Sequence, residues 1–484
     1  MRARCYLRMK APGALALLVL FLGVTLLLAV STKKRQTTAS RNSSNANGHL
    51  TSRSAATKKR HPGRRIRYYS PRVNPALRAK LQVEIGTRLN DSAPNAISYS
   101  TSLDGFYAHL AAYENSPHKG ETPADTLRVI QWGDSHTAAD MFTGEARRLF
   151  QQQFGDGGIG YVYAGHPFAG YRIFGSKQAQ SSGWKTDGNK FLQLGEGELG
   201  MGGISISTDQ PGEWVTLDAQ CTSLELQFLE QPNGGSLLFA DNGGDPVKID
   251  TAAQETGAGT FHYNCLPGDH HFEITTADSA TVTLLGWVAM QPGVTWESIG
   301  INGAEAPLML KWNQQLFSQF LKENSPALVV LAYGTNEASS AAWDEESYKQ
   351  TFASIVDTIH AYVPESSILV LGPADRAVIQ HRSWHALVGT DKIIEAQRAV
   401  CRTHGCAYWD ERKRMGGFGS MQQWVYAGWA QADHTHFTGD GYRALADALM
   451  ADLMAGFQVY KERSSPNAET AVQGDASGAG STNP

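Results

Sequence analysis

Apolar runs alternate with amphipathic segments near both ends of the body of this chain. Residues 327–333 (ALVVLAY) show the unbroken hydrophobicity of a strand buried on both faces, and residues 127–132 also have strand character. Further elements are predicted as strands at 368–371 and 407–409, and as helices at 138–153, 348–362, 392–403 and 438–457. This alternation predicts an α/β fold of three layers, α/β/α, in which helices cover both faces of a parallel central sheet.

The middle of the chain, residues 171–291, has a different pattern. Short alternating stretches are separated there by Gly, Asn, Asp and Pro turns, at residues 213–217, 224–228, 236–239, 271–275 and 281–287. This pattern is typical of a small β-sandwich. Because it separates residues 73–170 from residues 292–460, we predict that it is a domain inserted into the α/β domain.

The amino-terminal region predicts export. Residues 11–31 contain a long uncharged apolar stretch, which at 1.5 Å per residue spans about 30 Å, the thickness of a bilayer core. Residues 1–10 are basic and predicted to be cytoplasmic, so the body would be periplasmic, anchored to the inner membrane or released if the segment is cleaved. Residues 32–72 and 461–484 are poor in large apolar residues and are predicted to be a disordered linker and tail.

The charge is distributed unevenly. Residues 1–72 carry 16 Lys and Arg and no Asp or Glu, so residues 73–484 carry 26 basic against 46 acidic side chains. An acidic body argues against nucleic acid as a partner, because a phosphate-binding surface is basic.

Four cysteines follow the apolar segment. Their even number in an exported chain favours two disulfides, Cys221–Cys265 and Cys401–Cys406, and the alternative is four unrelated buried thiols. Neither pair has the spacing of a zinc site.

Two short motifs carry candidate chemistry. Gly133-Asp134-Ser135 directly follows the strand at 127–132, and the small Gly133 allows a sharp turn that exposes the Ser135 hydroxyl. Asp433-His434-Thr435-His436 supplies a base and a carboxylate close to each other. Ser135, His436 and Asp433 therefore form a candidate catalytic triad.

Each of these residues has an alternative role. Asp134 is expected to bind turn amides rather than take part in the chemistry. His434 competes with His436 as the base, but only His436 has a gap of two residues from Asp433. A metal site would need a second cluster of ligands, which the sequence lacks, so we expect neither a metal nor another cofactor.

Two further blocks lie between these motifs, Ile299-Gly300-Ile301-Asn302-Gly303-Ala304 and Tyr333-Gly334-Thr335-Asn336. The four blocks, in this order, resemble those of the SGNH (GDSL-type) hydrolase superfamily. The resemblance implies an oxyanion hole made by the backbone N–H groups of Ser135 and Gly303 and the side-chain amide of Asn336. Such donors stabilise the charge that develops on the oxygen of an attacked ester.

The surroundings of Ser135 resemble one branch more closely. Residues 133–140 (GDSHTAAD), 142–144 (FTG) and 154–160 (FGDGGIG) are similar to the Ape-type peptidoglycan O-acetylesterases. That branch implies a serine esterase that removes O-acetyl groups from N-acetylmuramic acid of cell-wall glycan through an acetyl-enzyme. It also implies a carbohydrate-module-like insertion.

Two rival functions remain open. A periplasmic O-acetyltransferase would use the same triad with a sugar hydroxyl in place of water. A noncatalytic wall-binding protein would keep the hydrolase fold without its activity.

Substrate-binding residues are predicted beside the triad and in the insertion. His136, which replaces the Leu of the common motif, is expected to line the pocket. Trp184, in a loop rich in Gly and Ser, is a candidate platform for sugar stacking, whereas Trp214 and Trp287 lie in alternating strands and are expected to be core.

Overall fold

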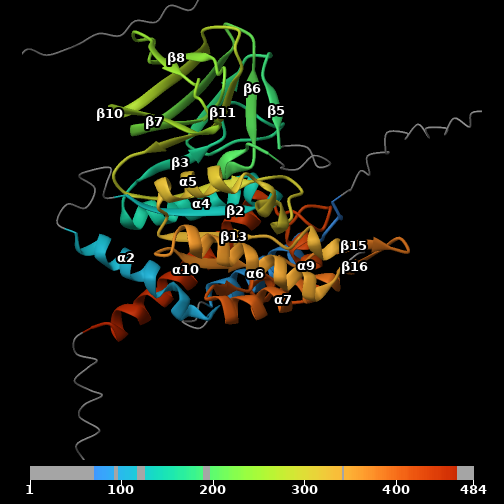
Figure 1. The fold of residues 1–484 in the computed structure, drawn as a ribbon. Helices are drawn as coiled ribbons and strands as arrows, with labels where there is room; N and C mark the ends of the chain where they lie inside the picture. Colours follow the sequence, from blue (N-terminus) through green and yellow to red (C-terminus); the bar gives the residue numbers. More distant parts are fainter. Residues whose placement is uncertain (1–69, 92–95, 117–125, 189–196, 341–342, 466–484) are drawn as a thin grey trace, which may run out of the picture. The chain divides into compact units, whose positions relative to one another are not determined.

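The computed structural model describes residues 70–91, 96–116, 126–188, 197–340 and 343–465, all of which belong to one structural unit, residues 66–484 (Figure 1). The predicted membrane segment, residues 11–31, and the basic segments on either side of it up to residue 69 lie outside the described residues. Within the described ranges, no helix has both the length and the hydropathy needed to cross a bilayer.

A six-stranded sheet forms the centre of the α/β part. Its order is β1 (Ile97–Ser98), β17 (Ala407–Trp409), β14 (Ser367–Leu371), β13 (Leu328–Ala332), β2 (Leu127–Gly133) and β12 (Val294–Gly300). The last five strands are mutually parallel, as the apolar runs predicted. The short edge strand β1 pairs with β17 in the antiparallel direction, so the sheet is mixed rather than wholly parallel.

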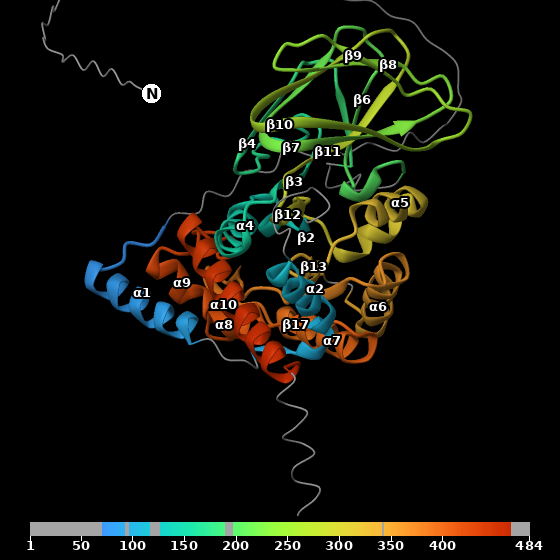
Figure 2. The same cartoon turned by 90° about the vertical axis from the view of Figure 1, so that its left-hand side faces the viewer.

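Helices cover both faces of this sheet. Alternate residues of β13 belong to different hydrophobic clusters: Val329 and Leu331 to one, Leu328 and Val330 to the other. The first cluster includes α5 (Gln314–Asn324), α6 (Glu345–Tyr362) and α7 (Gly389–His404). The second includes α1 (Pro75–Asn90), α2 (Asp104–Asn115), α4 (Met141–Phe154), α9 (Met421–Ala427) and α10 (Gly439–Arg463). The sheet therefore lies between two helical layers, as predicted (Figure 2).

The β-rich part forms one antiparallel sheet of nine strands. Its strands are β3 (Gly158–Val162), β4 (Ser176–Gln180), β5 (Lys185–Asp187), β6 (Ser205–Thr208), β7 (Trp214–Glu230), β8 (Ser236–Asp241), β9 (Val247–Asp250), β10 (Gly257–Thr276) and β11 (Val282–Met290). Because β7 pairs with β4 near one end and with β11 near the other, the strands join into a single hydrogen-bonded sheet. Two separate sheets, as in the predicted β-sandwich, are not confirmed.

The β-rich sheet also begins earlier than the predicted residue 171. Strand β3, residues 158–162, already pairs with β11. The indole N–H of Trp132 in β2 donates to the carbonyl of Met201 at 2.9 Å, and both residues belong to the same hydrophobic cluster. The inserted sheet and the α/β part therefore share core packing.

The four cysteines of the described residues are free thiols in this structure, so neither predicted disulfide is formed. Cys221 and Cys265 nevertheless lie on the paired strands β7 and β10, with their Sγ atoms 3.8 Å apart. Burial raises the pKa of Cys401 well above its ordinary value, and the neighbouring thiol of Cys406 adds to this effect.

Candidate active site

The turn after β2 exposes Ser135. A Cβ atom on Gly133 would lie 2.8 Å from the carbonyl oxygen of Ala332 and would also collide with Thr137, so only glycine fits there. Asp134 then caps the one-turn helix α3 (Ser135–Ala138), and its carboxylate accepts the N–H of His136 at 2.9 Å. This confirms that Asp134 holds the turn. Ser135 is thereby placed, partly exposed, at the carboxyl end of β2.

The structure brings the three predicted triad residues together. Ser135 Oγ lies 2.9 Å from His436 Nε2, across 301 residues of sequence. His436 Nδ1 lies 2.8 Å from Asp433 Oδ2. The other carboxylate oxygen of Asp433 accepts the backbone N–H groups of Thr435 and His436, each at 3.0 Å.

The charge on Asp433 determines the tautomer of His436. Burial alone would raise the pKa of Asp433, but the hydrogen bonds from the His436 ring and from two backbone N–H groups outweigh burial and lower the pKa to about 2. An ionised carboxylate only accepts hydrogen bonds, so His436 Nδ1 must donate. Nε2 is then left with a lone pair that can accept the Ser135 proton.

His434, the rival base, does not face Ser135. Its side chain is buried, and its ring stacks on Trp384 with ring centres 3.7 Å apart. Burial lowers the pKa of His434. His436 alone of the two therefore has the geometry of a general base.

The candidate oxyanion hole is assembled from three elements. Gly303, in the turn after β12, has φ +79°, a conformation that favours glycine. Neither its N–H nor that of Ser135 donates to an acceptor in the described part of the chain. The Asn336 amide donates to the Ala304 carbonyl at 2.8 Å and, more weakly, to Asp134 Oδ2 at 3.3 Å.

The ring of His136 lies next to that of His436. Its ring centre is 5.3 Å from that of His436, and its Nδ1 forms a hydrogen bond with the hydroxyl of Tyr442 at 3.0 Å. Burial lowers the pKa of His136 to about 3, and smaller electrostatic contributions come from His436 and Arg376. The residue as a whole is half-buried, its ring atom Nε2 is buried, and its role in lining the pocket stays a prediction.

Two residues at the site were not predicted from the sequence. Tyr442 comes from α10, which Thr438 caps as expected, but nothing in the sequence linked it to His136. Glu337 follows Asn336 directly, and its carboxyl accepts the N–H of Ala306 at 2.9 Å. Burial raises the pKa of Glu337 to about 8. The one sequence signal for Glu337 was its position, a charged residue directly after the Tyr333–Asn336 block.

The predicted sugar platform in the insertion is wrong. Trp184 is only 7% exposed, belongs to the hydrophobic core, and donates its indole N–H to the Trp214 carbonyl at 3.1 Å. Its loop folds back onto the sheet, which buries the ring. Trp287 is buried as predicted, whereas Trp214 is 37% exposed and is not a core residue.

Among the described residues, no group of three or more His, Cys, Asp or Glu side chains is placed to hold a metal ion.

The GDSL-like Lipase/Acylhydrolase family matches residues 271–444, which include Gly303, Asn336, Asp433 and His436 but not Ser135. A search of curated proteins found no match.

Among solved structures, a peptidoglycan O-acetylesterase is 25% identical and has a TM-score of 0.63, and the match covers 76% of this chain and 99% of that one. A family two carbohydrate esterase from Cellvibrio japonicus is 11% identical with a TM-score of 0.26, covering 58% of this chain and 98% of that one. The family match, the O-acetylesterase structure and the four motifs around one triad show that this chain is similar to the SGNH (GDSL-type) hydrolases and, among solved structures, to a peptidoglycan O-acetylesterase.

Proposed function

We propose that this protein is a serine esterase that removes O-acetyl groups from N-acetylmuramic acid of peptidoglycan through an acetyl-enzyme intermediate. The observation that carries the esterase chemistry is the continuous chain of contacts from Ser135 through His436 to Asp433. The similarity to a peptidoglycan O-acetylesterase supports the substrate.

The reaction begins with attack of Ser135 Oγ on the acetyl carbonyl carbon. His436 Nε2 takes the hydroxyl proton, and Asp433 stabilises the positive charge that forms on the ring. The carbonyl oxygen becomes negatively charged in the tetrahedral intermediate. This oxygen accepts hydrogen bonds from the backbone N–H groups of Ser135 and Gly303 and from the Asn336 amide. To donate to it, the Asn336 amide gives up its weak hydrogen bond to Asp134.

The intermediate collapses when the bond between the acetyl carbon and the sugar oxygen breaks. His436 returns the proton to that oxygen, so the sugar leaves as an alcohol and the acetyl group remains on Ser135. Water then gives a proton to His436 and attacks the acetyl carbon. The second collapse protonates Ser135 and releases acetate, which restores the starting enzyme.

Acetate release from O-acetylated peptidoglycan tests this proposal. Wild-type protein should release acetate, and the Ser135→Ala variant should release it at most at a rate several orders of magnitude lower. Acetylated sugar formed from an added glycan acceptor, without free acetate, would identify a transferase instead. Undiminished hydrolysis by Ser135→Ala would contradict both enzymatic functions.

We also propose that the protein acts in the periplasm, with residues 11–31 as an inner-membrane anchor. The support is the apolar segment itself and its basic amino-terminal flank. Cell fractionation, compared with a variant that lacks residues 1–31, tests this location.

A further inference from the structure

Buried and exposed side chains alternate along residues 171–174. Tyr171 and Ile173 belong to the hydrophobic core, whereas Arg172 is exposed and Phe174 is 50% exposed. The Arg172 guanidinium carbon lies 5.1 Å from the centre of the Phe174 ring, so the two exposed side chains share one face of this segment.

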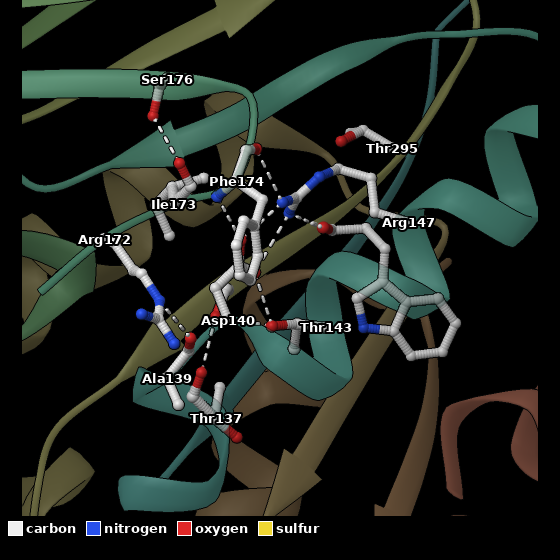
Figure 3. Close-up of polar contacts among 12 residues, drawn as sticks. Thr137, Ala139, Asp140, Thr143, Arg147, Arg172, Ile173, Phe174, Ser176 and Thr295 are labelled. Atoms are coloured by element: carbon white, nitrogen blue, oxygen red, sulfur yellow. Dashed lines mark hydrogen bonds and ion pairs between the residues drawn. The ribbon is translucent and has the colours of Figure 1, made fainter. Parts of the chain in front are cut away.

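A buried ion pair holds this segment against the helices that follow Ser135 (Figure 3). Asp140 Oδ2 accepts the backbone N–H of Phe174 at 2.7 Å, and Arg147 donates to the Phe174 carbonyl at 3.2 Å. Asp140 and Arg147 lie 2.6 Å apart and are nearly inaccessible to solvent. Both backbone polar groups of Phe174 are thus fixed by α4 and the residue that precedes it.

The same contact brings Arg172 close to the nucleophile. Arg172 Nε donates to the carbonyl of Ala139 over a long distance of 3.4 Å. Ala139 follows Ser135 by four residues across the single turn of α3, a separation of about 6 Å along the helix. The guanidinium group is therefore on the order of 10 Å from Ser135.

Arg172 has no carboxylate partner in the described part of the chain, unlike the two arginines of α4. Arg147 pairs with Asp140, and Arg148 pairs with Glu145. The Arg172 guanidinium instead lies 5.1 Å from the centre of the Phe174 ring. Gly144 makes room for that ring, because a Cβ atom there would lie 3.0 Å from Phe174 Cδ2.

From this arrangement we propose that Arg172 and Phe174 form a subsite for a carboxylate-bearing sugar next to the acetylated position. The planar guanidinium matches a carboxylate, with which it forms two parallel hydrogen bonds. The exposed ring offers an apolar face to the C–H groups of the pyranose. This subsite deepens the proposed esterase function, on which it rests for its biological substrate.

The experiment measures sugar binding directly, so it does not depend on turnover. Dissociation constants of the full-length protein in detergent are determined by NMR titration with three sugars. N-acetylmuramic acid carries its carboxylate on a lactyl ether, galacturonic acid carries it on the ring, and N-acetylglucosamine has none.

We expect wild-type protein to bind N-acetylmuramic acid about tenfold more tightly than N-acetylglucosamine, the preference that one charge-assisted contact provides. Arg172→Gln should remove this preference, and Arg172→Lys should retain part of it. Phe174→Ala should weaken both sugars alike. Arg148→Gln, which removes an exposed arginine from α4, is the matched control and should bind as wild type does.

Tighter binding of galacturonic acid than of N-acetylmuramic acid would show that the subsite recognises a uronic acid, whose carboxylate is attached to the sugar ring. Equal affinity for acidic and neutral sugars in the wild type would overturn the subsite, as would equal effects of Arg172→Gln and Arg148→Gln. Unchanged thermal unfolding of the variants excludes misfolding as the cause. If the binding pattern holds but peptidoglycan releases no acetate, the substrate proposal fails and the subsite stands.

Discussion

Replacing Asp433 by Asn tests the catalytic arrangement while preserving its shape. Asp433 Oδ1 accepts two backbone N–H groups at 3.0 Å, so the side-chain oxygen of Asn must keep that position. The new NH₂ group then occupies the position of Oδ2, which lies 2.8 Å from His436 Nδ1. It donates a hydrogen bond where the carboxylate accepted one, so Nδ1 must become the acceptor.

This change moves the proton of the His436 ring to Nε2. In that tautomer Nε2 has no lone pair for the Ser135 proton, which lies 2.9 Å away in the present arrangement. In serine hydrolases the wrong tautomer lowers kcat by about 10⁴. We therefore expect a loss of about 10³ to 10⁴ in kcat, or about 4 to 5.5 kcal/mol of transition-state stabilisation.

The assay is hydrolysis of 4-nitrophenyl acetate at neutral pH, with kcat and KM determined separately. Thermal unfolding should show that Asp433→Asn is folded at the assay temperature, because the two backbone contacts to the side-chain oxygen remain. His436→Gln should lose at least as much activity as Asp433→Asn. His434→Gln is the matched control, and its kcat should stay within a few-fold of wild type because His434 stacks on Trp384 away from Ser135.

Two results would refute this reasoning. An Asp433→Asn variant that keeps more than a tenth of wild-type kcat would show that Asp433 does not hold the tautomer. Equal losses in His434→Gln and His436→Gln would show that the base had been misassigned.

Three further predictions concern the residues around the triad. Asn336→Ala should lower kcat for 4-nitrophenyl acetate by about 10² to 10³, as expected for one oxyanion donor, and a loss below threefold would exclude that role. Asp140→Asn leaves the nearly buried Arg147 without its carboxylate and should lower the free energy of unfolding by about 3 to 5 kcal/mol in urea titrations. Glu145→Gln, whose partner Arg148 is 56% exposed, should cost less than about 1 kcal/mol, and equal costs would contradict the account. Burial raises the pKa of Glu337 from 4.5 to about 8, so the folded state retains a proton that the unfolded state loses over this range. That contribution to stability is complete below pH 4.5 and is lost as the pH rises to about 8, so the urea midpoint of wild type should fall more between pH 5 and 8 than that of Glu337→Gln. Parallel curves would disprove the shift.

Much of the α/β part could be predicted because its signals are local. Unbroken apolar runs indicated β13 and the other parallel strands, since strands buried on both faces need no polar positions. Two glycines mark the turns of the site: a side chain at Gly133 would collide with its neighbours, and Gly303 has a positive φ that other residues rarely adopt. The spacing of Asp433 and His436 suits a carboxylate that binds an imidazole ring three residues later.

The β-rich part was predicted less well for a physical reason. Alternation shows which side of a strand is buried, but not which strands pair or how many sheets they form. Strand β7 is continuous across two predicted strands and joins its neighbours into one sheet. Burial of Trp184 likewise depends on where its loop packs, which its Gly-rich and Ser-rich surroundings do not show.

The sequence by itself determined the hydrolase chemistry, because the residue types and their spacing restrict what each short motif can do. Only the tertiary structure decided that His436 rather than His434 faces Ser135, that Tyr442 contacts His136, and that Asp140 and Arg147 hold the backbone of Phe174. These contacts join side chains that are remote in the sequence or on different elements. Packing of the whole chain, which no local pattern encodes, brings them together.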